Sequence, residues 1–248
     1  MKAKQEMKNY TQDDSWVWNT LFNRQWENIP GKASRTYINA FKNMKPVLNA
    51  NEIPDFEKIN YWFRNRTGWE LQVVPGLIPV EEFFQLLAQK KFCSSTWLRA
   101  KNSLDYLEEP DMFHDIFGHV PLLSDPVFSE FVHEFGKLGC QFIGEAEKIL
   151  QLQRLYWFTI EFGVISEQNK IQSYGAGILS SFGETNQIDL GQANFLKYDI
   201  EKIIQKDFRT DVMQEDYFVI EDFEILFSSL KKLASHWQKN TYAKNLTV

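Results

Sequence analysis

The spacing of apolar residues predicts short helices and weak strands in the first part of the chain. Residues 32–44 carry Tyr37, Phe41 and Met44 at helical spacing, and residues 54–64 have a similar pattern. The segment 79–91 begins with Pro, has two Glu in its first turn and ends with two Lys, which favours a helix. Residues 71–74 and 91–99 are interpreted as short strands.

The rest of the chain is predicted to be mainly helical, with turns marked by Pro, Gly and Asp at 109–111, 118–126 and 173–191. Residues 1–28 are polar with scattered aromatic residues, so we interpret them as an N-terminal arm or short helix laid on the body. One main domain is expected over residues 29–248.

The last predicted element is a helix at about residues 221–240. Its apolar residues recur at alternating spacings of three and four: Phe223, Leu226, Leu230, Leu233 and Trp237. This pattern is also typical of a coiled coil, but the chain offers only about two heptads, below the usual requirement. Packing on the chain's own core is therefore the favoured interpretation.

Composition and charge narrow the classes of protein that fit this pattern. The chain has 248 residues, is 44% hydrophobic and carries a net charge of −6. This balance excludes a basic surface for nucleic acid and favours a small-molecule ligand. The N-terminus lacks the apolar stretch of a secretory signal, no segment is long enough to span a bilayer, and two cysteines form no CxxC motif. We expect a cytoplasmic protein that does not bind a membrane and has no disulfides.

Two of the chain's four histidines, His114 and His119, lie in one short motif, EEPDMFHDIFGHVPLLSDP. Their spacing of five residues would place the two rings about 140° apart on a regular α-helix. Gly118 and Pro121 bracket His119, so a distorted or ending helix could turn it toward His114. The pair is a candidate metal site that needs a third ligand, and a pair of core or surface histidines is the alternative.

Glu161 is the candidate third ligand because it lies in an aromatic run, LYWFTIEFGVI. A buried carboxylate requires a compensating charge, which a divalent ion provides. Two histidines and one carboxylate form the facial triad of non-haem iron oxygenases. Alternatively, Glu161 points to solvent or pairs with Arg154. In a helix, Trp157 would stand one turn before Glu161 and form an aromatic wall beside the metal.

A third motif, SYGAGILSSFGE, combines glycines with a pair of serines. It lacks the Lys and the glycine spacing of a phosphate-binding loop. The glycines instead suggest a tight turn or a close approach of two backbones. The Ser180 hydroxyl is a candidate partner for the second nitrogen of a metal-bound histidine.

Together, these three motifs resemble the catalytic domain of the pterin-dependent aromatic amino acid hydroxylases, especially the short bacterial phenylalanine hydroxylases. The resemblance runs from about residue 14 to 225. It implies a mainly α fold with small β-sheets, a helical basket around an iron cleft. It also implies a catalytic domain over 29–248, Fe(II) as the metal, and tetrahydrobiopterin or a related reduced pterin that helps dioxygen to hydroxylate an aromatic ring.

The resemblance assigns roles residue by residue. It implies catalytic metal ligands at His114, His119 and Glu161. It implies substrate contacts at Arg99, Asp111, Trp157 and Ser180, in which Arg99 forms an ion pair with the substrate carboxylate. It implies pterin contacts at Gly76, Ile78, Phe83, Asp115 and Tyr156. The lack of a regulatory extension and of a long coiled coil suggests a monomer.

Phenylalanine 4-hydroxylation is the leading reaction, because Trp157 matches the phenylalanine and tyrosine branches of the family better than the tryptophan branch. Tryptophan 5-hydroxylation and phenylalanine 3-hydroxylation remain alternatives within the family. A zinc hydrolase is a further alternative, although the chain lacks the HExxH geometry of metalloproteases. The last alternative is a metal-binding relative of the family that has no catalytic activity.

Overall fold

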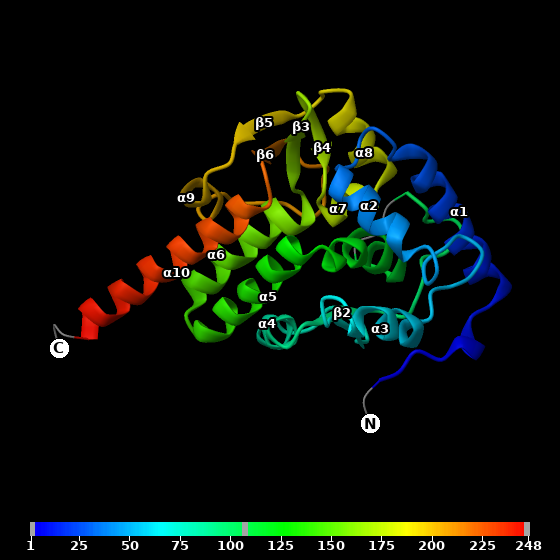
Figure 1. Cartoon of the computed structure of the whole chain (residues 1–248), viewed down its shortest axis with the longest axis horizontal. Coiled ribbons are helices and arrows are strands. Elements are labelled where there is room, and N and C mark those ends of the chain that lie inside the picture. The colour runs from blue at the N-terminus through cyan, green and yellow to red at the C-terminus, as the bar shows by residue number, and fades with distance from the viewer. Residues whose placement is uncertain (1–2, 106–108, 246–248) are drawn as a thin grey trace.

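The computed structural model describes residues 3–105 and 109–245, with side chains up to residue 238. Helices form most of the molecule, and there are two small sheets, of which the larger, with β3 to β6, lies along the top in Figure 1. The predicted class, mainly α with small sheets, is therefore confirmed. Within the described residues, none of the helices combines the length and the apolar character that crossing a membrane would require.

The predicted helices of the first part of the chain are confirmed, each with slightly shorter bounds. They are α2 (Arg35–Met44), α3 (Phe56–Arg64) and α4 (Val80–Ala88). Capping explains two of the starts: the side chain of Ser34 accepts from the backbone of Tyr37, and that of Asp55 caps α3. The predicted arm contains a 3-10 turn (Met7–Asn9) and the long helix α1 (Gln12–Asn28), whose apolar side belongs to the main core.

Two parallel strands, β1 (Glu70–Val73) and β2 (Lys91–Ser94), form the first sheet. The strand predicted over 91–99 thus ends at residue 94. The second sheet has the order β4-β3-β6-β5. Its strands are β3 (Val164–Glu167), β4 (Lys170–Ser173), β5 (Asn194–Lys197) and β6 (Asp216–Ile220). The prediction that the rest of the chain is mainly helical is confirmed, but it did not locate these four strands, which are only four or five residues long and show no clear alternation.

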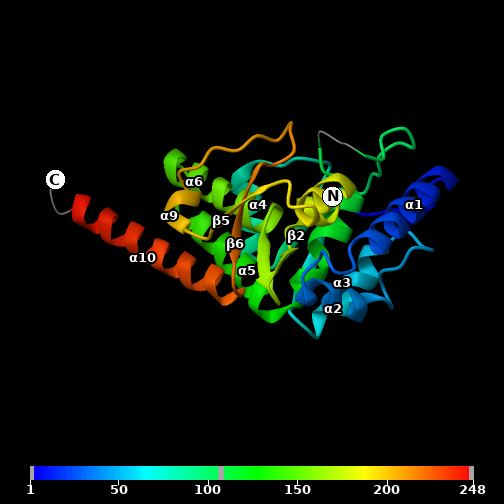
Figure 2. The ribbon, with the colours of Figure 1, turned by 90° about the horizontal axis from the view of Figure 1, so that it is seen from above.

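The remaining helical elements before the C-terminal helix are two π-helical segments, η2 (His114–His119) and η4 (Trp157–Glu161), a 3-10 turn, η3 (Val120–Ser124), and the helices α5 (Pro126–Gln141), α6 (Ala146–Tyr156), α7 (Ala176–Leu179), α8 (Phe182–Asp189) and α9 (Ile200–Ile203). Of these, α5, α6 and α9 lie on the same side of the molecule as the C-terminal helix α10 (Glu224–Asn245) (Figure 2). The predicted metal ligands lie on the two π-helical segments, His114 and His119 on η2 and Glu161 on η4. The unusual helical geometry therefore coincides with the candidate site.

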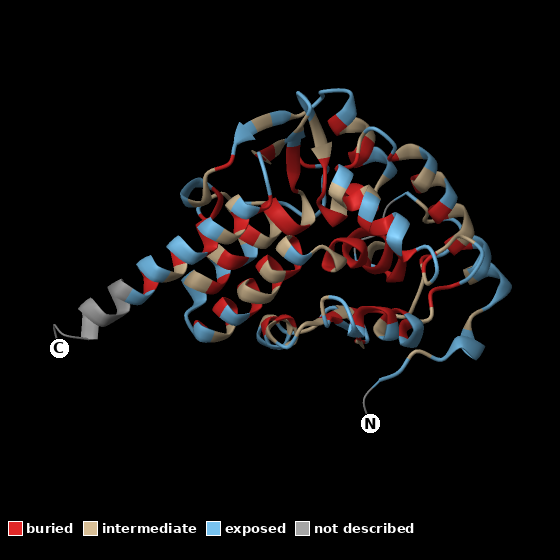
Figure 3. Cartoon of the chain, viewed as in Figure 1, coloured by how far each residue is buried: buried red, intermediate tan, exposed pale blue. Residues whose placement is uncertain are grey.

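The C-terminal helix α10 (Glu224–Asn245) packs against α5. Leu226, Leu230 and Leu233 are buried and belong to the main core. Packing on the chain's own core is therefore confirmed as the role of this apolar stripe. Figure 3 shows buried residues along the inward sides of the helices. In η2, all residues after His114 are buried.

Candidate metal centre and active site

A π-helical turn explains how His114 and His119 meet. In a π-helix, hydrogen bonds join residues five apart, so positions i and i+5 lie about one turn apart. The two Nε2 atoms face each other at 3.1 Å. The distortion predicted from Gly118 and Pro121 is present, and it takes the form of a widened, π-helical turn that ends at His119. Pro121 is the second residue of the 3-10 turn η3 that follows.

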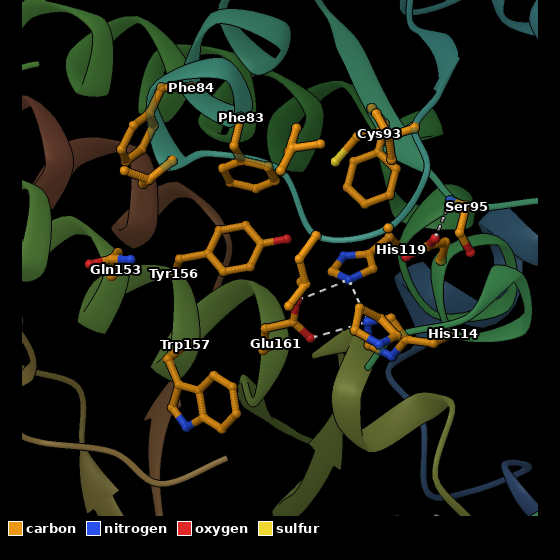
Figure 4. Close-up of a pocket in the computed structure, with 18 of the residues that line it drawn as sticks. Phe83, Phe84, Cys93, Ser95, His114, His119, Gln153, Tyr156, Trp157 and Glu161 are labelled. Carbon is orange, nitrogen blue, oxygen red and sulfur yellow. Dashed lines mark hydrogen bonds and ion pairs between the residues drawn. The ribbon is translucent and has the colours of Figure 1, made fainter. Parts of the chain in front are cut away.

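Glu161 ends the second π-helical segment and points toward both histidines (Figure 4). Its Oε1 atom lies 3.1 Å from the His119 Nε2, and its Oε2 atom lies 3.5 Å from the His114 Nε2. The alternative in which Glu161 pairs with Arg154 is contradicted, because Arg154 pairs with Asp207 and donates to the carbonyl of Ile204.

Glycines bring the two π-helical segments together through α7. A Cβ atom on Gly175 would lie 2.4 Å from the Glu161 carbonyl oxygen and 2.3 Å from the Gly163 nitrogen. A Cβ atom on Gly118 would lie 2.8 Å from the Ala176 carbonyl oxygen. The glycines of the third motif therefore serve a close backbone approach, one of the two roles predicted for them.

The Ser180 hydroxyl fixes the tautomer of His114. Its oxygen lies 2.9 Å from the His114 Nδ1, and the hydroxyl donates to the carbonyl of Ala176 at 2.8 Å. Since the single hydroxyl hydrogen is used on Ala176, Ser180 must accept a hydrogen from the His114 Nδ1. The His114 Nε2 then carries a free lone pair that faces His119 and Glu161, as a metal ligand requires.

The electrostatic environment keeps both types of ligand in their metal-binding forms at neutral pH. Burial lowers the pKa of His114 to about 4, so this imidazole is neutral. Burial opposes ionisation of Glu161, but His119, His114 and Tyr156 outweigh it and lower the pKa of Glu161 to about 2. A neutral imidazole beside an ionised carboxylate suits a divalent cation.

The donor set fits an octahedral first-row metal ion. With metal–ligand bonds of about 2.1 Å at right angles, neighbouring ligand atoms lie about 3 Å apart. The three separations between His114, His119 and Glu161 are 3.1, 3.1 and 3.5 Å. Two nitrogens and one carboxylate on one face leave the opposite face of such an ion open for other ligands.

A second cluster of metal-binding residue types, Glu130, His133 and Glu134, lies on α5. These side chains are partly exposed, and the two carboxylates are also within reach of Lys90 and Lys137. This arrangement resembles an ordinary charged helix surface more than a metal centre.

Arg99 and Asp111 form a buried ion pair next to the metal ligands. The Arg99 Nε and Nη2 atoms donate to the two Asp111 oxygens at 2.9 and 2.8 Å, and Nη1 donates to the Leu104 carbonyl. Burial opposes ionisation of Asp111, but its bonds to Arg99 prevail and lower its pKa. Asp111 also accepts from the backbone nitrogen of His114 at 3.1 Å, so the pair is tied to the metal site.

The candidate metal ligands form part of the wall of a largely apolar cavity of about 280 Å³. The residues predicted for the pterin all line this cavity: Gly76, Ile78, Phe83, Asp115 and Tyr156. Trp157 lines it as well, whereas the described wall does not include Arg99, Asp111 or Ser180, which lie behind the metal ligands. Phe83 and Tyr156 meet edge to face, with ring centroids 5.2 Å apart.

Two polar groups of this wall are suited to a hydrogen-bonding ligand. Burial raises the pKa of Asp115 to about 7, and its carboxylate accepts from the Ser95 backbone nitrogen at 3.0 Å. The Ser95 hydroxyl is buried and has no hydrogen-bond partner among the residues that the structure describes. Buried polar atoms normally have hydrogen-bond partners, so a molecule bound in the cavity would supply one for the Ser95 hydroxyl.

Sequence reasoning missed several residues of the cavity wall, among them Phe92, Cys93, Gln153 and Phe208. Phe92 and Cys93 lie on the strand predicted over 91–99, whose orientation toward the histidines was not apparent. Burial raises the pKa of the Cys93 thiol to about 12, so it is a neutral wall residue. Phe208 lies far along the chain in a segment with no motif, and no sequence signal singled it out.

Comparison with known proteins identifies the family. The family model for biopterin-dependent aromatic amino acid hydroxylases matches residues 3–245. The phenylalanine-4-hydroxylase of Chromobacterium violaceum is 40% identical over 91% of this chain and 75% of that protein. The chloroplastic phenylalanine 4-monooxygenase of Pinus taeda is 33% identical over 91% of this chain and 63% of that protein.

Solved structures agree with this assignment. A crystal structure of the Chromobacterium violaceum phenylalanine hydroxylase with iron(III) and oxidised 7,8-dihydrobiopterin matches with a TM-score of 0.88 and 37% identity, over 96% of this chain and 86% of that one. The structure of the same enzyme with iron and phenylalanine has a TM-score of 0.85, with 38% identity over 92% and 82% of the two chains. The sequence, the fold and the arrangement of the three motifs thus agree, and this chain belongs to the biopterin-dependent aromatic amino acid hydroxylases.

Proposed function

We propose that this chain is a phenylalanine 4-monooxygenase that converts L-phenylalanine to L-tyrosine with Fe(II), dioxygen and a tetrahydropterin. The observation that carries this proposal is the facial arrangement of His114, His119 and Glu161, within 3.5 Å of one another in the wall of an aromatic cavity. The names of the relatives with 38% to 40% identity support phenylalanine as the substrate.

When bound, ferrous iron and a tetrahydropterin supply the electrons that activate dioxygen for insertion of one oxygen atom into the aromatic ring. The protein holds the metal through two neutral nitrogens and one carboxylate, which leaves three coordination positions open. The aromatic wall limits the access of water to this open face, since Phe92, Phe83 and Tyr156 surround it.

For the substrate, we assign the carboxylate to Arg99 and the aromatic ring to the side of the cavity formed by Trp157. A guanidinium has five N–H donors, so Arg99 keeps capacity for a ligand after its bonds to Asp111 and Leu104. Asp111 orients the guanidinium in this role. Ser180 acts through His114, because its hydroxyl is bonded to the His114 ring.

For the pterin, we assign the wall opposite Trp157, where the loop with Gly76 and Ile78 precedes α4. Phe83 offers a ring face for stacking with a flat heterocycle, and Tyr156 packs edge to face against it. Asp115 and the unpartnered Ser95 hydroxyl supply polar contacts on the same cavity wall.

The experiment is to incubate the purified chain with Fe(II), tetrahydrobiopterin, oxygen and phenylalanine, and to separate the products by chromatography. We expect tyrosine, formed only when both iron and pterin are present. His114→Ala, His119→Ala and Glu161→Ala should each abolish tyrosine formation, because each removes a metal ligand. Formation of 3-hydroxyphenylalanine instead, or of 5-hydroxytryptophan when tryptophan competes with phenylalanine, would contradict the proposed reaction.

Two further results would remove the chain from this activity altogether. Hydrolytic activity with zinc, together with inactivity with iron, would favour a hydrolase. Iron that binds without oxygen consumption in the presence of pterin and phenylalanine would favour a non-catalytic relative.

A further inference from the structure

The segment between α9 and β6, orange in Figure 2, reaches the active-site cavity through one aromatic residue. Phe208 lines the cavity and stacks on Trp157, with ring centroids 4.6 Å apart and an interplanar angle of 18°. Trp157 also contacts Phe162, whose ring centroid lies at 4.6 Å with an angle of 39°. The position of the Trp157 ring therefore depends on a segment remote from the metal-binding motifs.

One buried amide, that of Gln214, connects this segment to Trp157. The Gln214 Oε1 atom accepts from the Trp157 indole nitrogen at 2.9 Å. The Gln214 Nε2 atom donates to the Arg209 carbonyl at 2.8 Å, the residue that follows Phe208. The Gln214 side chain thus bonds both to the edge of the Trp157 ring and to the backbone next to Phe208, which stacks on that ring.

The backbone of Gln214 is itself fixed from three sides. Its N–H donates to the Glu184 carboxylate at 3.1 Å, and its carbonyl accepts from the Gln187 side chain at 2.5 Å and from the Tyr217 hydroxyl at 3.1 Å. Gln214 is only 6% exposed. Since α8 and β6 hold the main chain in place, the amide has a fixed direction toward Trp157.

We propose that Gln214 is a positioning residue that sets the width of the aromatic amino acid subsite. By fixing the tilt of Trp157 and holding Phe208 against it, the amide favours the single ring of phenylalanine over the larger indole of tryptophan. The proposal deepens the proposed function and rests on it for the identity of the substrate. The alternative is that Gln214 only stabilises the segment between α9 and β6.

The first test concerns the bond between Gln214 and Trp157 and needs no metal, pterin or activity. In ¹H–¹⁵N spectra, the indole N–H of Trp157 is assigned by its loss in Trp157→Phe. In Gln214→Leu, which removes both hydrogen-bonding groups at similar size, this N–H should shift and exchange with solvent about tenfold faster. Asp211→Ala is the control, because it removes a surface ion pair with Arg209 in the same segment and leaves both amide bonds of Gln214 in place.

The second test measures the equilibrium affinity of the iron-loaded protein for phenylalanine and for tryptophan by calorimetry. In Gln214→Leu, we expect phenylalanine affinity to fall about three- to tenfold, the effect of one net hydrogen bond, and tryptophan affinity to fall less. Asp211→Ala should keep the wild-type ratio of the two affinities.

Several results would overturn the proposal. An unchanged affinity ratio in Gln214→Leu, or an equal change in Asp211→Ala, would show that the segment has a general structural role only. A wild-type protein that binds neither amino acid would refute the subsite, and with it the proposed function. A wild-type protein that binds phenylalanine without making tyrosine would refute the proposed function alone, since the affinity ratios would still test Gln214.

Discussion

At the scale of single residues, the metal site depends on protonation states that the fold imposes. His114 has one nitrogen bonded to Ser180 and one facing the other ligands, so its tautomer is set before a metal binds. Glu161 remains ionised although it is buried, because its partners lower its pKa to about 2. The site is therefore preorganised for a cation.

Ser180→Ala should weaken iron binding about 10- to 100-fold, because it removes the group that orients the His114 ring. The measurement is a competition titration of Fe(II) against a chelator of known affinity. Ser181→Ala is the matched control: Ser181 caps α8 through the Glu184 backbone nitrogen, so its loss should reduce stability and leave iron affinity unchanged. Wild-type iron affinity in Ser180→Ala would show that the hydroxyl does not support His114.

Asp111→Asn should destabilise the protein by about 3–5 kcal/mol at neutral pH, because it leaves the buried Arg99 without its ion pair. The folded-state pKa of Asp111 is lowered below the usual 3.8, so the ionised carboxylate stabilises the fold above that pH. This contribution is lost as the pH falls through the folded-state pKa. The stability difference between wild type and variant should therefore shrink below about pH 4.

Denaturant unfolding of both proteins between pH 3 and pH 7 measures this difference. Asp105→Asn is the control, because Asp105 pairs with Arg24 at the surface and its loss should have little effect. A difference that stays constant over this pH range would argue against the buried ion pair.

At the scale of elements, two π-helical segments and a glycine-rich helix make the site. An α-helix would direct His114 and His119 to different sides, whereas the wider turn brings their Nε2 atoms to 3.1 Å. Gly175 lets α7 press against the backbone of Glu161. Backbone geometry thus positions the ligands as much as the side chains do.

Gly175→Ala should destabilise the protein by about 1–3 kcal/mol and weaken iron binding, since the new Cβ atom would meet backbone at 2.3–2.4 Å. Gly183→Ala is the matched control: its Cβ atom would make only ordinary contacts, with Met213 at 3.7 Å and Ser181 at 4.0 Å, and alanine is favoured in a helix. Thermal unfolding and iron titration of both variants give the comparison. Equal behaviour of the two variants would exclude the close contact at Gly175.

The sequence predicts those elements whose signals are local. The helices at 35–44, 56–64 and 80–88 have regular apolar spacing, the first two also have side-chain caps, and all three form where expected. The sheet of β3 to β6 was missed, since strands such as Asn194–Lys197 are short and mostly exposed. The π-helical form of residues 114–119 was also missed, because Gly118 and Pro121 indicate that a helix is distorted but not how, and the close packing of Gly118 against α7 is not visible in the sequence.

The residues of the candidate site also differ in whether a local sequence signal reveals them. The motifs around His114, Glu161 and Ser180 could be read from the sequence because each has an unusual local composition. Gln214 and Phe208 could not, since they reach Trp157 only through the fold. Only the interatomic distances in the folded structure show that these two residues contact Trp157.

At the scale of the whole molecule, one main core includes residues from α1 to α10. The apolar stripe of α10 is buried on its own chain within the described residues, which leaves it unavailable for a coiled coil. The cytoplasmic location and the monomeric state expected from the sequence stay predictions. Light scattering should give a mass near 29.3 kDa, and a value twice as large would contradict the monomer.

The central claim is that side chains from two distant segments share one metal ion. The most direct measurement is a crystal structure of the Fe(II)-loaded protein with an anomalous difference map recorded at the iron edge. We expect one peak about 2.0–2.3 Å from the facing atoms of His114, His119 and Glu161. A peak at Glu130, His133 and Glu134 instead, or iron bound by fewer than three of the predicted ligands, would contradict the account.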